Sequence, residues 1–437
     1  MNVPTIYLEK TEVVGMREMK NSRLEYVGMV PQSWESHPLY CFFGERKNKN
    51  YDLQEKNLLS LSYGKVMRKS IDTVGGLLPS SFNTYNIVEK GDIIIRPTDL
   101  QNDKKSLRTG LVKERGIITS AYIDLCPLPG VNSAFFHYLL HAYDIMKVFY
   151  NMGNGVRQGL NFGEFSKLMV YYPKKEEQEA IVLFLDAKCT QIDDLSEGIQ
   201  KEINTLEVYK RSVISEVVTK GLNKNAEMHD SGIEWLGRIP RNWDTKRGKY
   251  IFEQKSDRGN SISLVLLSPT QNYGVIPQEL YEELTGFSAV KLNEKTDFNA
   301  LKTVHKGAFV ISLRSFQGGF EYSEYEGVVS PAYQVFYPTI PVCDGYYKYL
   351  FKTQVFIDKM NSYTMSFRDG KNIAFSDFGR TYIPIPPLQE QIDIASYLNK
   401  KCSEIDLIIA KKKEQLEVLA DYKKSLIYEY VTGKKEV

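Results

Sequence analysis

The sequence predicts an α+β protein in which two repeated α/β domains are separated by two long helices, which form an antiparallel coiled coil within the chain. Three observations predict this architecture. Two stretches with helical periodicity match each other without a gap, a second short match opens each half of the chain, and the segments between are β-rich runs broken by turn residues. Repeats of this kind decide the domain organisation before any single motif does.

The helical stretch near the middle of the chain is repeated at its end. Residues 173–221 align with residues 386–434 at one constant offset, so that Cys189 falls on Cys402. The identical pairs include Glu177/Glu390, Gln178/Gln391, Ile181/Ile394, Leu185/Leu398, Asp193/Asp406, Leu206/Leu419, Tyr209/Tyr422 and Lys210/Lys423.

A second match opens each half of the chain. Residues 19–34 (MKNSRLEYVGMVPQSW) align with residues 228–243 (MHDSGIEWLGRIPRNW), and weaker matches such as Tyr63-Gly64 with Tyr273-Gly274 lie further on. Shared frames with different interiors predict one scaffold that presents two different surfaces. Neutral drift after a gene duplication is the alternative.

The helical repeats are amphipathic. A helix of about 30 residues, from about Ile192 to about Lys220, would be about 45 Å long at 1.5 Å per residue. Its narrow apolar stripe needs a partner, and we expect the second copy of the same stripe to be that partner, with homodimerisation as the alternative. The predicted interface residues are Ile192, Leu195, Ile199, Ile203 and Leu206 in the first copy and Ile405, Ile408, Leu416, Leu419, Tyr422 and Leu426 in the second.

The repeats divide the chain into four parts: residues 1–172 (the first α/β domain), 173–222 (the first helical spacer), 223–385 (a linker and the second α/β domain) and 386–437 (the second helical spacer). Within the α/β domains, β-rich runs lie at Ile93–Ile95, Ile117–Ile123, Ala308–Leu313 and Val328–Phe336. Helical patterns lie at Phe135–Tyr150 and Tyr346–Met360.

The composition is that of an ordinary globular protein. The chain has 437 residues, of which 42% are hydrophobic and 25% charged, with a net charge of +2. No apolar run approaches the roughly 18–20 residues that span a bilayer, and no signal peptide opens the sequence. The five cysteines are scattered without a C-x-x-C pair. We therefore expect a cytoplasmic protein without disulfides, a metal site or a membrane partner.

Motifs for catalysis are missing from the sequence. It has no G-x-x-x-x-G-K-[ST] loop and no Asn/Asp-Pro-Pro-aromatic tetrapeptide of the kind that amino-methyltransferases use. His137 and His141 are spaced i, i+4 but lack the glutamate of H-E-x-x-H. The sequence therefore predicts no catalytic centre.

Basic and amide side chains recur on turns between the predicted strands. Arginine can bind the O6/N7 edge of guanine, asparagine and glutamine can bind adenine, and lysine more often binds phosphate. The candidate DNA-binding residues are Tyr63, Lys65, Arg68, Arg96, Thr98, Lys104, Lys105, Arg108, Arg157 and Gln158 in the first domain and Asn272, Tyr273, Arg314, Ser315, Gln317, Arg368 and Lys371 in the second.

Several of these motifs together carry a family resemblance that covers nearly the whole chain. The frame Trp235–Trp243 (WLGRIPRNW), with Tyr26–Trp34 as its degenerate copy, resembles the opening of target-recognition domains in type I restriction–modification specificity subunits. Pro386–Gln391 (PPLQEQ), followed by Ile405-Asp406, Tyr422-Lys423 and Val431–Gly433, resembles the central helical region of that family. The first copy departs slightly, with Lys174-Lys175 in place of Pro-Leu.

The resemblance implies a non-catalytic, DNA-reading subunit. Each recognition domain would read one half of a bipartite double-stranded target, and the paired helices would set the gap between the halves. Two methyltransferase subunits would dock on the helices, and motor-nuclease subunits would join for cleavage. S-adenosylmethionine, ATP and magnesium would be bound by these partners and no cofactor by this chain. A single-chain enzyme and a coiled-coil adaptor that binds only proteins are the rival hypotheses.

Overall fold

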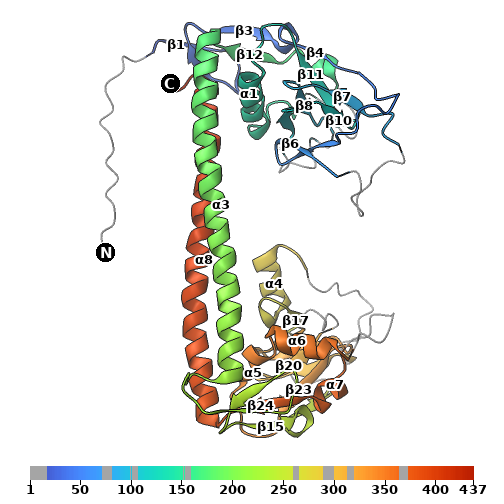
Figure 1. Ribbon diagram of the computed structural model, residues 1–437, viewed down its shortest axis with the longest axis vertical. Coiled ribbons are helices and arrows are strands. Elements are labelled where there is room, and N and C mark those ends of the chain that lie inside the picture. The colour runs from blue at the N-terminus through green and yellow to red at the C-terminus, as the bar shows by residue number, and fades with distance from the viewer. Residues whose placement is uncertain are drawn as a thin grey trace. The chain divides into compact units, whose positions relative to one another are not determined.

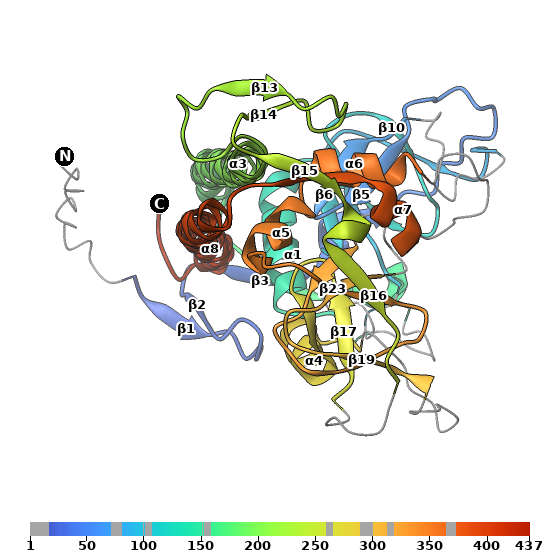
Figure 2. The same cartoon turned by 90° about the horizontal axis from the view of Figure 1, so that it is seen from below.

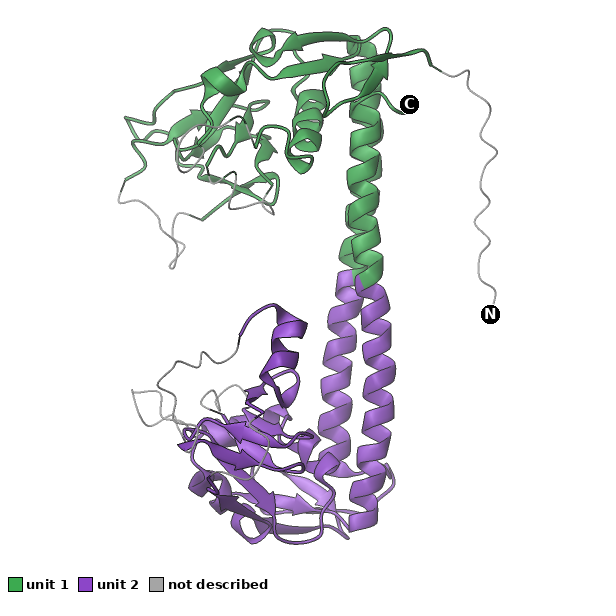
Figure 3. Cartoon of the chain, turned by 180° about the vertical axis from the view of Figure 1, so that it is seen from behind, with its two compact units in different colours: residues 1–199, 414–437 green, residues 200–413 purple. Residues whose placement is uncertain are grey.

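The computed structural model describes residues 17–70, 81–98, 100, 107–150, 152, 159–258, 265–288, 300–312, 319–363 and 373–437. The chain forms two compact units (Figure 3). Unit 1 contains Met1–Ile199 and Glu414–Val437, and unit 2 contains Gln200–Lys413. The sequence predicts separate helical segments at 173–222 and 386–437, whereas the structure divides each long helix between the two units.

Two long helices carry the repeated segments. Helix α3 spans Lys175–Lys220, 46 residues, and helix α8 spans Leu388–Val431, 44 residues. The estimate of about 30 residues from about Ile192 therefore covers only part of α3. The first turn of α3 is stabilised by acidic residues at its N-terminus and by Gln178, whose side-chain amide donates to the carbonyl of Pro173 at 2.9 Å. At 1.5 Å per residue α3 is about 69 Å long.

Within each unit the two helices run side by side and antiparallel (Figure 1). In unit 1 the ammonium of Lys423 lies 2.5 Å from the carboxylate of Asp193, and in unit 2 Lys210 lies 2.6 Å from Asp406. These four residues are two copies of one lysine–aspartate pair. Such reciprocal contacts arise when two equivalent helices pair antiparallel, so the predicted antiparallel coiled coil is confirmed.

The interface between the helices follows a heptad pattern with alternating steps of three and four residues. Of the predicted interface residues, Ile192, Ile199, Ile203, Ile405 and Leu426 are buried, and Leu206, Leu416 and Leu419 are half-buried.

The prediction is wrong for Leu195, Ile408 and Tyr422, which are 54%, 44% and 53% exposed. The heptad pattern passes instead through the neighbouring residues Ser196, Ile409 and Lys423. Ser196 and Lys423 are polar, so in the sequence the apolar residues next to them, Leu195 and Tyr422, are easily mistaken for the interface positions.

The α/β domain of unit 1 is built from short antiparallel strands. β4, β11, β8 and β9 form a four-stranded sheet, and β1·β2, β3·β12, β5·β6 and β7·β10 form two-stranded ribbons. The strands are β1 (Met19–Asn21), β2 (Met29–Pro31), β3 (Glu35–Pro38), β4 (Phe43–Glu45), β5 (Leu59–Ser62), β6 (Lys65–Arg68), β7 (Asn86–Val88), β8 (Ile93–Ile95), β9 (Thr109–Leu111), β10 (Gly116–Ile118), β11 (Ile123–Pro127) and β12 (Met169–Tyr172). The helices are η1 (Leu39–Cys41), α1 (Ser133–Ile145) and α2 (Phe162–Phe165).

The α/β domain of unit 2 repeats this pairing strand for strand. β16, β23, β20 and β21 form the four-stranded sheet, and β13·β14, β15·β24, β17·β18 and β19·β22 form the ribbons. The strands are β13 (Met228–Asp230), β14 (Arg238–Pro240), β15 (Asp244–Arg247), β16 (Phe252–Lys255), β17 (Leu267–Thr270), β18 (Gly274–Pro277), β19 (Lys302–Val304), β20 (Phe309–Ile311), β21 (Phe320–Tyr322), β22 (Gly327–Val329), β23 (Gln334–Pro338) and β24 (Tyr382–Ile385). The helices are η2 (Gly248–Tyr250), α4 (Gln278–Thr285), α5 (Asp344–Leu350), α6 (Gln354–Asn361) and α7 (Phe375–Arg380).

Three predicted elements are each broken in two. The runs Ile117–Ile123 and Val328–Phe336 contain a turn between two strands, β10–β11 and β22–β23. The helical pattern Tyr346–Met360 is divided between α5 and α6, because Thr353 caps α6 by accepting a hydrogen bond from the backbone N–H of Phe356.

Each α/β domain is attached to the helices by an equivalent tyrosine. In unit 1, Tyr138 on α1 donates its hydroxyl to Asp186 on α3 at 2.7 Å, and in unit 2, Tyr349 on α5 donates to Asn399 on α8 at 2.8 Å. Tyr346 also donates to the carbonyl of Val218 at 2.7 Å, so α5 contacts both helices (Figure 2). No helix within the described ranges has an apolar stretch long enough to cross a lipid bilayer.

Candidate nucleic-acid interface

A tight hairpin in unit 1 carries three of the predicted DNA-binding residues. Ser62 pairs with Lys65, so only Tyr63 and Gly64 form the turn, with φ of 47° and 76°. Two positive φ values are what a type I′ hairpin requires. A side chain at Gly64 would also come within 3.0 Å of Leu107. The turn leaves Tyr63 90% exposed, as a ring on which a base or sugar could stack.

The equivalent hairpin in unit 2 has one more turn residue. Thr270 pairs with Gly274, and the φ of Gly274 is 75°. The hydroxyl of Thr270 accepts a hydrogen bond from the backbone N–H of Tyr273 at 3.1 Å. This loop exposes Asn272 and Tyr273, the two described candidates of this unit. The repeated Tyr-Gly dipeptide thus lies on the same hairpin in both units, with different neighbours.

The two cations beside the unit 1 hairpin are exposed but paired. Lys65 lies 3.3 Å from Asp193 on α3, and Arg68 donates to Glu114 at 2.6 Å. The hydrogen bonds from Arg68 lower the pKa of the Glu114 carboxyl. Because these ion pairs are solvated, a phosphate could displace either carboxylate at small cost.

Arg108 is not available to DNA, and its prediction as a DNA-binding residue is wrong. Its side chain is 0% exposed and donates to the hydroxyl of Tyr150 at 2.9 Å and to the carbonyl of Thr98, while its backbone N–H donates to Asp144. Fully buried arginines need partners of this kind because their charge cannot be removed. Arg96 is half-buried and Thr98 is exposed. The backbone N–H of Arg96 donates to the carbonyl of Arg108, and the carbonyl of Thr98 accepts from the Arg108 side chain.

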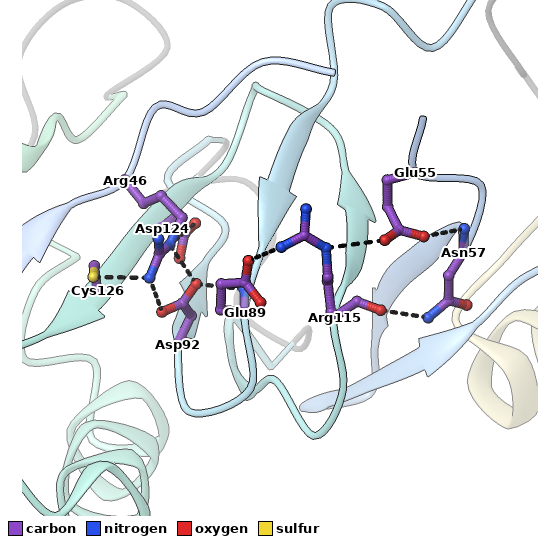
Figure 4. Close-up of polar contacts among 8 residues, drawn as sticks. All are labelled: Arg46, Glu55, Asn57, Glu89, Asp92, Arg115, Asp124 and Cys126. Carbon is purple, nitrogen blue, oxygen red and sulfur yellow. Dashed lines mark hydrogen bonds and ion pairs between the residues drawn. The ribbon is translucent and has the colours of Figure 1, made fainter. Parts of the chain in front are cut away.

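A second polar network holds the inner part of this domain together (Figure 4). Arg46 donates to Asp92 at 2.8 Å and to the sulfur of Cys126 at 2.9 Å, and it lies 3.8 Å from Asp124. Burial and the adjacent Asp92 raise the pKa of the Asp124 carboxyl.

Arg115 joins two acidic residues next to this network. Its guanidinium lies 3.2 Å from Glu55 and contacts Glu89, and its carbonyl accepts from Asn57. The arginines of both networks are thus engaged with carboxylates. Arg46, whose partners Asp92 and Asp124 are buried, therefore serves the fold, whereas Arg115 is exposed and its ion pairs are solvated like that of Arg68.

Comparison with known families agrees with this two-domain arrangement. The model of the type I restriction modification DNA specificity domain matches residues 83–205 and 240–418, one match for each half of the chain. The chain belongs to this family.

Individual relatives are distant. A protein of Methanocaldococcus jannaschii described as a type I restriction enzyme MjaX specificity subunit is 24% identical over 305 residues, which cover 69% of this chain and 67% of that protein. A chain from a structural study of complex assembly and conformational transition of the type I R-M system is 14% identical, with a TM-score of 0.66 over 93% of this chain and 99% of that one. The HsdS subunit of Thermoanaerobacter tengcongensis is also 14% identical, with a TM-score of 0.49, over 93% of this chain and 98% of that one.

More than half of the predicted DNA-binding residues of this specificity-family chain lie outside the described residues. They are Lys104, Lys105, Arg157, Gln158, Arg314, Ser315, Gln317, Arg368 and Lys371. These positions stay predictions.

Exposed apolar residues lie next to the lysine–aspartate pairs of the helices, and the sequence had assigned three of them, Leu195, Ile408 and Tyr422, to the helix interface. In unit 1 the exposed Leu195 and Tyr422 flank the Asp193–Lys423 ion pair, and in unit 2 the exposed Ile408 and Tyr209 flank the Asp406–Lys210 pair. These are the same two positions of the repeat. The repetition of these positions in both copies could have indicated an exposed site, but their closeness to the heptad pattern led to their assignment to the helix interface.

Proposed function

We propose that this chain reads a bipartite DNA target, with one α/β domain for each half, and carries methyltransferase subunits on its paired helices. It performs no chemistry itself; methylation and cleavage belong to partners that bind S-adenosylmethionine, ATP and magnesium. The carrying observation is the repetition of one complete domain, including its Tyr-Gly hairpin, with different exposed side chains in the two copies. Two domains with the same fold but different exposed side chains are suited to two different half-sites.

The hairpins support the DNA part of this proposal. Each combines an exposed aromatic ring with neighbours that can bind DNA, Lys65 and Arg68 in unit 1 and Asn272 in unit 2. Lysine and arginine fix the protein on phosphates, while arginine and asparagine can also read base edges. With a net charge of only +2, the chain needs partner subunits to complete the phosphate contacts.

The exposed apolar residues on the helices support the partner part. An isoleucine or leucine and a tyrosine lie beside the lysine–aspartate pair in each unit, and an apolar surface of this kind favours a protein contact. Since the position is present twice, it suits two copies of one methyltransferase subunit.

A domain exchange tests the proposal. The chain is assembled with its methyltransferase and S-adenosylmethionine, and the modified bases are mapped on genomic DNA. Replacing residues 24–172 with the corresponding domain of another family member should change one half of the target and leave the other half intact. Methylation irrespective of sequence, or a change in both halves, would contradict it. A protein-only adaptor predicts no effect of the chain on target choice.

A further inference from the structure

One cavity lies at the base of the helix pair in unit 2, away from the hairpins. It has a volume of about 500 Å³ and is lined by Leu222, Asn223, Ala226, Glu227, Arg241, Asn242, Glu390 and Asp393. These residues come from the segment between α3 and β13, from the turn that follows β14 and from the first turns of α8.

The corresponding place in unit 1 holds an arginine of the chain itself. Arg17 lies 2.7 Å from the carboxylate of Glu177, and its guanidinium carbon lies 5.7 Å from the centre of the Trp34 ring. Trp34 donates its indole N–H to the same carboxylate at 3.2 Å. The carboxylate thus bridges a guanidinium and an indole.

The backbones of the two places are equivalent residue by residue. In unit 1 the N–H of Gln32 donates to the carbonyl of Glu18 at 2.8 Å, and in unit 2 the N–H of Arg241 donates to the carbonyl of Glu227 at 2.8 Å. The residue before Glu18 is Arg17, and the residue before Glu227 is Ala226. Unit 2 therefore keeps the glutamate and the tryptophan but has a methyl group where unit 1 has a guanidinium.

Without that guanidinium, the carboxylate and the indole in unit 2 are no longer joined. Glu390 accepts instead from the side-chain amide of Asn242 at 3.2 Å. Trp243 is only 4% exposed, and its indole N–H is buried without an acceptor among the described residues. Because a buried donor without a partner costs free energy, a rearrangement that brings an acceptor to the indole N–H of Trp243 would stabilise the protein.

The charge around the cavity favours a cation. Glu227 is paired with Arg241 at 2.9 Å, but the hydrogen bonds to Glu390 and Asp393 come from neutral amides, those of Asn242 and Gln389. Among the described residues, neither of these two carboxylates is paired with a cation. Asp393 replaces Ala180 of the other copy and Arg241 replaces Gln32, so the cavity of unit 2 has the same net charge as the place in unit 1 that binds the guanidinium of Arg17. The same charges repel the phosphates of DNA.

We propose that the cavity of unit 2 receives the guanidinium of an arginine from a partner protein, in the manner that Arg17 occupies unit 1. The guanidinium binds Glu390 and Asp393, and Glu390 swings back to accept from Trp243. Arginine suits the site better than lysine because its planar fork can bind two carboxylates at once. That the partner is a methyltransferase subunit rests on the proposed function; the guanidinium site itself does not.

The first test uses the full chain and a small probe. The chain has three tryptophans, so 5-fluorotryptophan labelling gives three fluorine NMR signals, and a Trp243→Phe variant assigns the relevant one. N-acetyl-arginine amide should shift the Trp243 signal saturably, with a Kd on the order of 1 mM for a single side chain. Its neutral analogue N-acetyl-citrulline amide and inorganic phosphate should not. No saturable shift, or an equal shift with the citrulline compound, overturns the site.

A variant that fills the cavity from within gives the matched control. Ala226→Arg reproduces the arrangement of unit 1 and should abolish the response to the probe, while Glu234→Arg places an arginine on the exposed turn of the same ribbon and should not. A response that persists in Ala226→Arg overturns the assignment.

The second test concerns the partner. Binding of the methyltransferase subunit should be at least about tenfold weaker for Ala226→Arg than for wild type or Glu234→Arg, by sedimentation velocity. Unchanged assembly of Ala226→Arg, with the probe site intact in wild type, overturns the partner assignment alone. If the wild-type chain responds to the probe but never binds the methyltransferase, the proposed function fails and the guanidinium site stands.

Discussion

Arg68 and Arg108 were indistinguishable as sequence and have opposite environments in the structure. Both lie at the end of a strand in the first domain, but Arg68 is exposed at the end of β6 while Arg108, directly before β9, is fully buried. What decides between them is the presence of carbonyl, hydroxyl and carboxylate partners that come from residues up to 42 positions away, such as Tyr150. A local pattern carries no information about such partners.

Arg108→Met should therefore destabilise the protein without altering which target it selects. The substitution leaves the carbonyl of Thr98 and the hydroxyl of Tyr150 without their charged donor, and losing one partner of a buried charged cluster costs about 3–5 kcal/mol. Urea unfolding measures the loss, and base mapping at low temperature measures the target. A stable Arg108→Met variant with relaxed specificity would return Arg108 to the DNA interface.

Glu114→Ala should strengthen DNA binding by the assembled complex. The change releases Arg68 from its only described carboxylate partner and removes a negative charge beside the proposed DNA contact, so affinity should rise roughly several-fold. Arg68→Ala should weaken binding and reduce the slope of log affinity against log salt by about one. Titration of a fluorescent duplex at several salt concentrations measures both. Glu25→Ala, which removes an exposed carboxylate from the β1–β2 turn, is the control and should leave affinity unchanged.

Glu321 should make unit 2 less stable as the pH rises. Burial raises the pKa of its carboxyl from 4.5 to about 7, although Lys352 lies 2.5 Å away and opposes the shift. Between these two pH values the folded state holds a proton that the unfolded state has lost, so the free energy of unfolding falls as the pH rises through this window and is constant above it. The contribution is up to about 3 kcal/mol.

Urea unfolding at pH 5 and pH 8 measures this dependence. Glu321→Gln should reduce the difference between the two pH values, whereas Glu324→Gln, an exposed neighbour on the same segment, should not. An equal pH dependence in wild type and Glu321→Gln would show that Glu321 ionises normally.

At the scale of elements, the existence and pairing of the long helices could be predicted from sequence, but their seam could not be placed residue by residue. The ungapped repeat required two equivalent helices, and equivalence favours antiparallel pairing. The length estimate that began near Ile192 left out the first turns of α3, which pack against the α/β domain of unit 1. Leu195 was misplaced because Ser196 occupies the seam position beside it.

Ile203 and Leu195 provide a direct test of the seam. Ile203→Ala removes a side chain that is 1% exposed and should cost about 2–4 kcal/mol. Leu195→Ala removes one that is 54% exposed and should cost less than about 0.5 kcal/mol. Thermal unfolding of the isolated chain compares the two. Similar losses would restore the interface predicted from the sequence.

The hairpins show the same limit for the DNA-binding residues. The Tyr-Gly repeat identified the turn in both copies, because positive φ at glycine is a local property. Whether a neighbouring cation is exposed, paired or buried depends on the packing of distant strands. For that reason Tyr63, Lys65 and Arg68 were found together, and Arg108 was wrongly added to them.

At the scale of the whole molecule, the duplication leads to the hypothesis that the length of the helix pair determines the gap between the two half-sites of the target. Seven residues inserted into each helix, after Ile199 in α3 and after Lys412 in α8, keep the heptad register and lengthen each helix by about 10 Å. If the helices set the distance between the two recognition domains, the gap between the half-sites should grow by about three base pairs, with neither half-site altered. Base mapping of the assembled complex measures the gap. Replacing an existing heptad with the same seven residues is the control, because it changes sequence without length. An unchanged gap in the longer chain would mean that the partner subunits, rather than α3 and α8, fix the spacing.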